Sequence, residues 1–507
     1  MPEQFLHGVE VVEIDTGPRP ISTVRSSVIG IVGTAPAADG ATQASLQTGV
    51  VTTKNALVWT AKSPAYAGAV GNAITVELKN PGTASAALSV TAVGTAITVS
   101  LATDAQKVIT STAALVLAAV NALPAAAALV TIARASGSDG TGVVGATAKV
   151  ALAGGENQPF PVDTPVLITS RREAARLGTS GTLPAAIDGI FDQAGAVVVV
   201  VRVTQAAGGD ADATTVSNVI GTVTGGGQYT GALALLGAEA AVGVVPRILI
   251  APGYTQMQSV LSNFLGIADK LRAVVIADGP NTTDAAAIQY RQLWGSPRVY
   301  LVDPWVRVWD TTLSAERIEP ASARVAGMIS RSDNDRGFWW SPSNQEMYGI
   351  LGPARPVDFA LGDVTSRANI LNEAGLATII QQQGFRLWGN RGCAMDPKWA
   401  FLCVRRTADM INESLLRAHL WAVDRNITRT YVQDVVEGVN AYLRHLRAVG
   451  AIIGGSCWAD PALNTPDQIA QGKVYFDFDF SAAYPAEHIT FRSHLVNDYL
   501  VEILKAA

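Results

Sequence analysis

The sequence predicts an α/β protein whose core is a mainly parallel sheet, with a β-rich insertion and a mixed α+β part at the end of the chain. Short Val- and Ile-rich runs, such as residues 197–203 and 273–277, alternate with helical segments through the middle of the chain. Apolar strands separated by helices are typical of parallel sheets covered on both faces. In addition, both ends of the chain carry strand patterns instead of polar tails.

The core is expected in two pieces, residues 21–40 and 159–357, on either side of the insertion. Its first strand is the apolar run 27–33, which leads into a loop rich in Gly, Ala and Pro. The further core elements are expected to be strand 166–168, helix 171–177, helix 183–193, strand 197–203, strand 248–251, helix 256–270, strand 273–277, helix 284–293 and strand 299–302.

The insertion, residues 41–158, differs from the core in composition. It is rich in Ala, Thr, Val and Gly, and its only aromatic residues are Trp59 and Tyr66. Alternating apolar residues predict strands, and one Ala-rich run predicts a helix. The expected elements are strands 74–78, 88–93, 96–101 and 129–132 and helix 111–122. We therefore expect a small β-rich domain of its own.

The C-terminal part, residues 358–496, begins with helical patterns. A helix over 407–422 places Glu413 and Arg417 in the favourable i,i+4 order on its polar face. A second helix starts at Thr430, whose spacing to Gln433 permits a capping box. The pair Gly454-Gly455 is expected to end the helical region.

Strand patterns close the chain. Residues 474–480 alternate strictly, and residues 488–492 form a second short alternating run after a Pro-containing connection, so the two are expected to pair as an antiparallel hairpin. Two strands are marginal alone and need further strands. The apolar face of this hairpin is expected to carry Phe476, Phe478, Phe480, Ile489 and Phe491.

Two terminal arms, residues 1–20 and 497–507, are the candidates for those further strands. Terminal segments usually fray unless another part of a structure ties them down. Strand addition to a sheet edge is a known mode of recognition, and it uses such segments. The residues expected in these inter-subunit strands are Val9, Val11, Val12 and Ile14 at one end and Tyr499, Val501 and Ile503 at the other.

Composition excludes several classes of protein. The 507 residues are 49% hydrophobic and 16% charged, with a net charge of -5 and no long basic run, so no nucleic-acid partner is expected. The most apolar span, residues 113–133, is interrupted by Asn121 and Pro124, so no membrane crossing or direct membrane binding is expected. Three scattered cysteines and five histidines show no metal-ligand spacing, and we expect no metal or cofactor.

Enzyme motifs are present only as fragments. His7-Gly8, Asp15-Thr16-Gly17 and Gly178-Thr179-Ser180 each echo part of a subtilisin triad, but His7 precedes Asp15, and both lie outside the expected core. Residues 140–145 match GxGxxG without a following helix, which favours a hairpin over a dinucleotide site. A hydrolase that retains an α/β fold stays as the alternative function, although no catalytic residue is assigned.

Four stretches closely resemble the sheath protein of contractile phage tails and the related pyocins. They are FLHGVEVVEIDTGPRPISTVRSSVIGIVGTAP at residues 5–36, GFRLWGNRG at 384–392, INESLLRAHLWAVDRN at 411–426 and FDFDFSAAYPAEHITFR at 476–492. The matches are long and span both ends of the chain. The resemblance implies a subtilisin-like core, a C-terminal domain carrying strand-exchange arms, and an insertion on the outer surface.

The same resemblance implies a function. The subunit is expected to polymerise into six-fold rings, stacked helically around an inner tail tube, and to contract so that the tube is driven through the host envelope. The implied partners are further copies of the chain, the inner tail tube protein, the baseplate and the tail terminator, in a virion tail assembled in the host cytoplasm. A static polymeric shell that uses the same arms without contracting is the second alternative.

Basic residues of the C-terminal part are candidates for contact with an acidic inner tube; an exposed helix face is the simpler interpretation of the same charges. The six candidates are Arg386, Arg391, Lys398, Arg405, Arg406 and Arg417.

Overall fold

The computed structural model describes residues 20–311 and 313–500 and divides the chain into two compact units. The main unit contains the described residues up to Pro36, then Val162–Ala175, and the chain from Thr179 onward. The inserted unit contains Ala37–Pro161 and Arg176–Gly178, so the expected insertion, residues 41–158, lies inside it. No helix among the described residues is long and apolar enough to cross a membrane.

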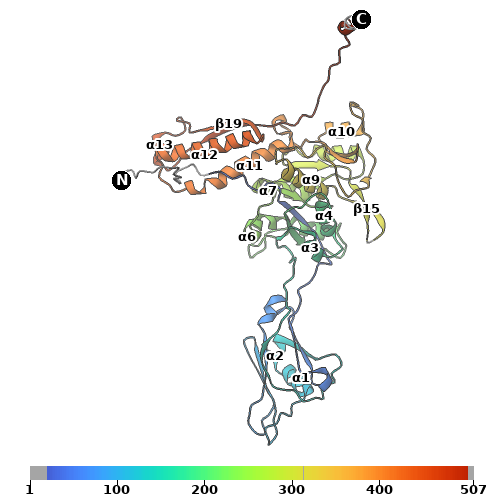
Figure 1. The fold of residues 1–507 in the computed structure, drawn as a ribbon, viewed down its shortest axis with the longest axis vertical. Coiled ribbons are helices and arrows are strands. Elements are labelled where there is room, and N and C mark those ends of the chain that lie inside the picture. Colours follow the sequence, from blue (N-terminus) through green and yellow to red (C-terminus); the bar gives the residue numbers. More distant parts are fainter. Residues whose placement is uncertain (1–19, 312, 501–507) are drawn as a thin grey trace, which may run out of the picture. The chain divides into compact units, whose positions relative to one another are not determined.

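A six-stranded sheet forms the centre of the main unit (Figure 1). Neighbouring strands run parallel except for the edge strand β9, which pairs antiparallel with β10. In spatial order the strands are β13 (Val299–Val302), β12 (Val274–Asp278), β11 (Ile248–Ile250), β1 (Ile29–Thr34), β10 (Val198–Val203) and β9 (Val166–Ile168). Nearly all their side chains are buried, as expected for Val- and Ile-rich strands covered on both faces. The predicted mainly parallel α/β sheet is confirmed.

Helices cover both faces of this sheet. Phe264 and Ile267 of α7 pack against Val199, Leu249 and Val275 on one face. Helices α4 and α9 lie against the opposite face, where α4 contacts β1 and α9 contacts β11 and β12. The helices of this region are α3 (Arg171–Ala174), α4 (Thr182–Phe191), α5 (Ala213–Ile220), α6 (Ala238–Val242), α7 (Gln258–Leu271), α8 (Asp284–Gln292) and α9 (Ser322–Asp335).

Small antiparallel sheets and long helices complete the main unit. The sheets consist of β14 (Val306–Asp310), β15 (Ala315–Glu319) and β16 (Gly352–Pro353), of β17 (Thr378–Gln381) and β18 (Phe385–Trp388), and of β19 (Ile452–Trp458) and β20 (Asp477–Ala482). The helices are α10 (Arg367–Glu373), α11 (Leu402–Ala418), α12 (Arg429–Ala448) and α13 (Pro466–Ala470).

The inserted unit has its own hydrophobic core around Trp59, whose indole N–H donates to Thr48 Oγ1 at 2.9 Å. One sheet holds β2 (Ser45–Thr48), β3 (Leu57–Ala61) and β7 (Val130–Arg134); the other holds β5 (Ser89–Val93), β6 (Ala96–Ser100), β4 (Thr75–Lys79) and β8 (Thr147–Ala151). Helices α1 (Ala113–Ala122) and α2 (Pro124–Leu129) complete it.

Two expectations about the C-terminal helices are wrong in detail. Helix α11 begins at Leu402, five residues before the expected start, and it ends at Ala418. Helix α12 is capped by the side chain of Thr428, which accepts from the N–H of Tyr431, so Thr430 and Gln433 form no capping box. The early start matters because it brings Arg405 and Arg406 onto the helix.

Buried ion pairs fasten α11 to the central α/β region. Arg406 pairs with Asp333 at the end of α9, with an Nη1–Oδ1 distance of 2.7 Å, and their side chains are 3% and 2% exposed. Asp409 accepts from Arg298 at 2.6 Å and 3.0 Å. One turn on, Glu413 pairs with Arg247 at 2.8 Å. The polar side of α11 is therefore an internal surface.

A buried carboxyl group, Asp278, ends strand β12. It accepts hydrogen bonds from the N–H and the hydroxyl of Ser322, at 2.8 Å and 2.6 Å, at the start of α9. Burial raises the pKa of Asp278 to about 6, although these bonds act to lower it.

We expect Asp333→Ala to destabilise the main unit by about 3–5 kcal/mol, because it leaves the Arg406 guanidinium buried without its carboxylate. The matched control is Glu239→Ala, which removes one of the two carboxylate partners of Arg417, in an ion pair whose side chains are 40% and 54% exposed. That change is expected to cost about 1 kcal/mol or less. Urea unfolding measures both, and equal losses contradict the prediction.

We expect Asp278→Asn to remove one component of the pH dependence of stability. Since the folded-state pKa of about 6 lies above the unfolded value, roughly 3.9, the folded chain binds this proton more readily. Ionised Asp278 therefore opposes folding above pH 6, and wild-type stability recovers as the pH falls from 6 toward 4. Urea midpoints at pH 7.5 and 5 should converge for wild type and variant at the lower pH. Parallel curves contradict this expectation.

Candidate assembly interface

The sheet of β19 and β20 has only two strands. Its strands pair antiparallel from Ile452↔Ala482 to Trp458↔Asp477, with an irregularity near Gly454. Among the described residues no third strand pairs with either outer edge. Such a sheet is marginal alone, and its outer edges offer unpaired N–H and C=O groups.

Helix α12 covers one face of this sheet (Figure 1). Val439 and Leu443 pack in one cluster with Phe478 and Phe480. Asn440 of the helix holds the end of β19 through both the C=O and the N–H of Cys457, at 3.0 Å and 2.8 Å. Phe476, Phe478 and Phe480 pack against this cluster, as the alternation of residues 474–480 predicts, but strand β20 begins only at Asp477 and ends at Ala482.

Strand β19 was not expected from the sequence. A Cβ atom at Gly455 would lie 2.6 Å from the carbonyl oxygen of Asp479, so glycine permits the close approach of the two strands. Across the same pair, Asp479 Oδ1 accepts from the N–H and the hydroxyl of Ser456 at 2.8 Å and 3.1 Å. The Gly-Gly pair thus lies inside a strand and does not simply end the helical region.

The expected hairpin between residues 474–480 and 488–492 is wrong. Strand β20 pairs with β19, and residues 488–492 form no strand. Ile489 and Phe491 are 68% and 92% exposed, so they are not part of the sheet's apolar face. Tyr499 is also exposed, in a 3-10 turn at Asp498–Leu500. Val501 and Ile503 lie outside the described residues.

Two contacts hold the chain where it leaves β20. The ring of Tyr484 meets Phe401 edge-on, with centroids 6.1 Å apart. Glu487 accepts from Arg391 Nε at 2.8 Å. We define residues 488–500 as the C-terminal segment; it follows this anchor as an exposed stretch without helix or strand up to the turn at Asp498–Leu500 (Figure 1).

The start of the described chain is anchored beside the same sheet. The hydroxyls of Thr23 and Tyr442 lie 3.0 Å apart, and the N–H of Val24 donates to Ser414 Oγ at 3.1 Å. Ile21 and Val24 pack against the cluster that contains α12 and β20. The expected arm residues Val9, Val11, Val12 and Ile14 lie outside the described residues, but the point from which the arm leaves is fixed.

The six basic candidates have different surroundings. Arg406 is wrong as a surface contact, because it is buried against Asp333. Arg405 pairs with Asp409 at 2.7 Å and stacks on Trp399. The remaining four are placed as follows: Arg391 pairs with Glu487, Arg417 pairs with Glu239 and Glu413, Arg386 donates to two backbone carbonyls, and Lys398 is exposed.

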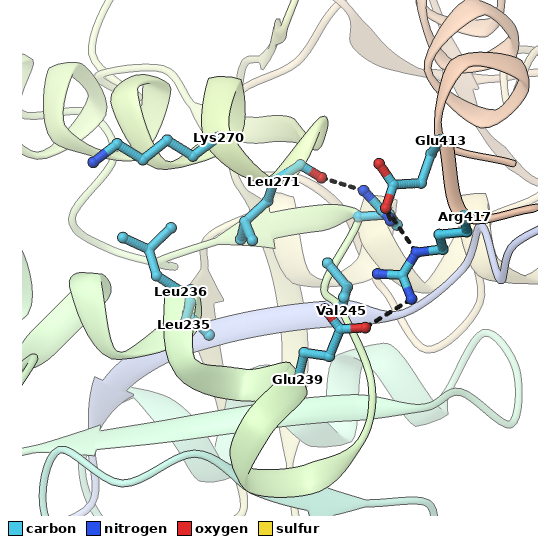
Figure 2. A pocket seen from close by; sticks show the side chains of 9 residues that line it. Leu235, Leu236, Glu239, Val245, Lys270, Leu271, Glu413 and Arg417 are labelled. Carbon is cyan, nitrogen blue, oxygen red and sulfur yellow. Dashed lines mark hydrogen bonds and ion pairs between the residues drawn. The ribbon is translucent and has the colours of Figure 1, made fainter. Parts of the chain in front are cut away.

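A cavity of 110 Å³ lies where α11 meets the α/β region (Figure 2). Figure 2 shows Glu413 and Arg417 pointing toward each other, with Arg417 also reaching Glu239. Burial acts to raise the pKa of Glu413, but hydrogen bonds from Arg417 and Arg247 outweigh it and lower that pKa. Arg247, Glu413, Arg417 and Glu239 pair with one another, and the lining residues include no Ser, Thr, Cys or His. This cavity is a junction between parts of the fold.

The carboxyl ends of the central strands, where α/β enzymes bind ligands, are filled by side chains. Asp278 and Ser322 bond to each other and are buried. Tyr254 is buried as well, and its hydroxyl donates to Asp210 at 3.0 Å. Ser180 lies in a bend before α4, while His7 and Asp15 lie outside the described residues. The described residues therefore bring no catalytic triad together.

Comparison with known families matches three models to the chain. The phage tail sheath protein central domain matches residues 227–393, and the phage tail sheath C-terminal domain matches residues 394–495. The tail sheath protein Gp18 domain III N-terminal region matches residues 110–203.

Three curated relatives agree. The tail sheath protein of Burkholderia phage BcepMu is 32% identical over 99% of both chains. A putative prophage major tail sheath protein of Pseudomonas aeruginosa is 46% identical, over 68% of this chain and 89% of the relative. The tail sheath protein of Escherichia phage P2 is 36% identical, over 72% of this chain and 92% of the relative.

Solved structures share the fold. The contracted helical sheath of the anti-feeding prophage superposes with a TM-score of 0.52 at 21% identity, covering 66% of this chain and 89% of that one. The contracted sheath complex of the extracellular contractile injection system PVC gives 0.51 at 19% identity, covering 68% and 89%. The agreement of whole-length relatives, family models and fold shows that this chain belongs to the phage tail sheath proteins, structural components of the phage tail and not enzymes.

Proposed function

We propose that the chain polymerises in six-fold helical rings around an inner tail tube and contracts to drive that tube through the host envelope. Membership of the tail sheath family is the observation that carries this proposal. The similar structures include contracted sheaths and a baseplate, which supports self-assembly and contact with a baseplate for this chain as well. A tail terminator is the partner proposed for the opposite end.

Strand exchange is the proposed link between subunits. The β19–β20 sheet has two open edges, and the chain offers two candidate strands, the N-terminal arm and the C-terminal segment. Each added strand forms several main-chain hydrogen bonds, at about 1 kcal/mol net per bond, and buries its apolar side chains. In the described structure Phe491 and Leu495 are 92% and 99% exposed, which is the surface such an exchange removes from water.

Strand exchange between subunits is also compatible with contraction of the tube. The N-terminal arm leaves from the Thr23–Tyr442 contact, and the C-terminal segment leaves from the Arg391–Glu487 contact. Chain just beyond each anchor changes direction through a few φ/ψ angles, so subunits can rotate while the added strands remain paired. The energy for contraction then comes from differences in packing between the extended and contracted tubes.

Contact with the inner tube is proposed for the exposed basic residues of the C-terminal part, with Lys398 first among them. Four further candidates already have partners within the chain: Arg386, Arg391, Arg405 and Arg417. In this proposal they contact the tube only through guanidinium N–H groups that these partners do not use. Arg406 does not, because its burial excludes it.

The inserted unit is proposed to lie on the outside of the tube and to be dispensable for polymerisation. Its core is separate, and no strand of it joins the central sheet. Two relatives are covered over 89% and 92% of their length by only 68% and 72% of this chain, so about a third of this chain has no counterpart in them.

We expect the full chain to form hollow striated tubes in negative-stain electron microscopy, and the chain lacking residues 1–16 to form only monomers or small oligomers. The truncation leaves Ile21, Thr23 and Val24 in place, so it should keep the wild-type circular dichroism spectrum. Tubes from the truncated chain refute arm exchange. Tubes that form but never shorten point to a static shell, and hydrolysis of peptides or esters by a monomer points to the alternative enzyme.

We expect replacement of residues 41–158 by a short Gly/Ser linker to leave tube formation intact. The main unit keeps its six-stranded sheet, since the insertion supplies none of its strands. Thinner-walled tubes of the same axial repeat are the expected image. Loss of folded protein, measured by circular dichroism, shows instead that the main unit needs the insertion.

A further inference from the structure

Four loops at one end of the inserted unit form a continuous surface. They are residues 49–56, 80–88, 101–112 and 135–146. Backbone hydrogen bonds of 2.8 to 3.0 Å join them, from Gly142 N–H to Lys54 C=O, from Val144 N–H to Ser111 C=O and from Ser85 N–H to Asp104 C=O. The chain enters and leaves the unit at the other end, where Thr42 pairs with Glu156. We call this free end the four-loop surface.

Four basic side chains are exposed at this surface, and none of them forms an ion pair with a described residue. They are Lys54 and Lys107 in the loops, and Lys79 and Arg134 at the ends of strands β4 and β7, which lead into the loops. Lys54 donates to the carbonyl of Gly137 at 3.2 Å, which leaves its ammonium group two further N–H donors. These charges are therefore available to a ligand.

The two acidic residues of the four loops accept hydrogen bonds from their own turns. Asp104 Oδ1 accepts from the N–H groups of Gln106 and Val108, at 2.9 Å and 2.8 Å. Asp139 Oδ1 accepts from the hydroxyl and the N–H of Thr141, at 2.6 Å and 3.0 Å, and these bonds hold the pKa of Asp139 below its usual value. The carboxylates thus stabilise turns and do not pair with the four cations.

Two of the cations occupy backbone positions that do not favour lysine. Lys54 and Lys107 have φ angles of 60° and 65°, in the left-handed region where Gly and Asn are the usual residues. A glycine at either position stabilises the turn better and lacks the charge. The choice of lysine is consistent with a role for its side chain outside the fold.

Small apolar side chains accompany these charges. Val50, Val108 and Val143 are 56%, 60% and 47% exposed. The loops contain no aromatic residue, so the bases of a single-stranded nucleic acid find no ring to stack on. Cations beside exposed valines suit a sugar polymer with acidic groups, since the C–H faces of sugar rings can pack on apolar side chains while the acidic groups meet the cations.

Charge also distinguishes the inserted unit from the rest of the chain. Its residues, Ala37–Pro161 and Arg176–Gly178, include seven basic and five acidic ones, whereas the whole chain has 37 and 42. We propose that the four-loop surface binds an anionic polysaccharide of the cell envelope. The proposal rests on the outer position proposed above for the inserted unit and adds a ligand class for it. A unit on the outside of the tail is exposed to the envelope that the tube crosses.

The test uses the full-length chain as free subunits, below the concentration at which tubes form. Beads carrying dextran sulfate should retain the wild-type chain at low salt and release it at high salt, because salt screens exposed charges. Beads carrying uncharged dextran should not retain it. Lys79→Gln combined with Lys107→Gln should weaken the apparent affinity about ten-fold. Neither side chain forms a hydrogen bond or ion pair in the described structure, so the wild-type circular dichroism spectrum is expected.

The matched control combines Lys62→Gln with Lys149→Gln. It removes the same charge from the same unit, but Lys62 follows strand β3 and Lys149 lies within β8, outside the four loops. This control should bind as wild type does. Equal affinities of the two double variants, or a wild-type chain that the charged beads do not retain, overturn the proposal.

Soluble competitors identify the ligand class. A phosphorylated lipopolysaccharide should displace the chain from the beads at a lower concentration of negative charge than double-stranded DNA or polyglutamate. Competition by DNA or polyglutamate that is equal or stronger overturns the assignment to a polysaccharide. Because free subunits are used, failed binding by a chain that forms tubes refutes only this assignment. Binding by a chain that forms no tubes places the failure in the proposed function.

Discussion

Helix α11 holds the β19–β20 sheet on the α/β region through charges that are largely buried. Taking a carboxylate and a guanidinium out of water costs several kcal/mol per ion, and a close pair mainly recovers that cost. Asp333–Arg406, Arg298–Asp409 and Arg247–Glu413 therefore add little net stability. They tolerate only a narrow range of positions, because a displaced partner leaves a buried charge unpaired. In the proposed assembly this part transmits force between subunits, and such a role needs a well-defined geometry.

The same set of contacts fixes where the arm begins. Ser26 donates to Asp333, and the carbonyl of Ser26 accepts from Arg406, so the N-terminal chain is part of the ion-pair cluster. Thr23 and Val24 then lead it across α11 and α12. The root of the N-terminal arm and the β19–β20 sheet consequently move as one body. In the proposed assembly, a change of angle between neighbouring subunits therefore requires a change of backbone angles in the arm, outside these anchoring contacts.

The sequence predicts the central sheet well, because strands buried on both faces leave short Val- and Ile-rich runs that alternate with helical segments. The sequence does not predict ion pairs whose two residues are far apart in the chain. Glu413 and Arg417 do form the expected i,i+4 pair, but Arg247, which completes the site, lies over 160 residues away and leaves no local signal. From the sequence alone, the polar side of α11 is therefore expected to be a solvated face.

The wrong hairpin has a different cause, and it explains the chemistry of the interface. The alternation in residues 488–492 predicts a strand, but alternation does not indicate whether its partner lies in the same chain or in another copy. Strand β20 already pairs with β19, a strand that is not recognisable in the sequence because it contains Gly454 and Gly455. Tyr484 and Glu487 hold the chain that follows β20 in place. The segment is thus left extended, with apolar side chains in water and an unused sheet edge on the same molecule. The anchors at Tyr484 and Glu487 hold the segment where it leaves β20. In the strand exchange proposed above, identical copies satisfy each other, and this mismatch within one chain is what favours polymerisation.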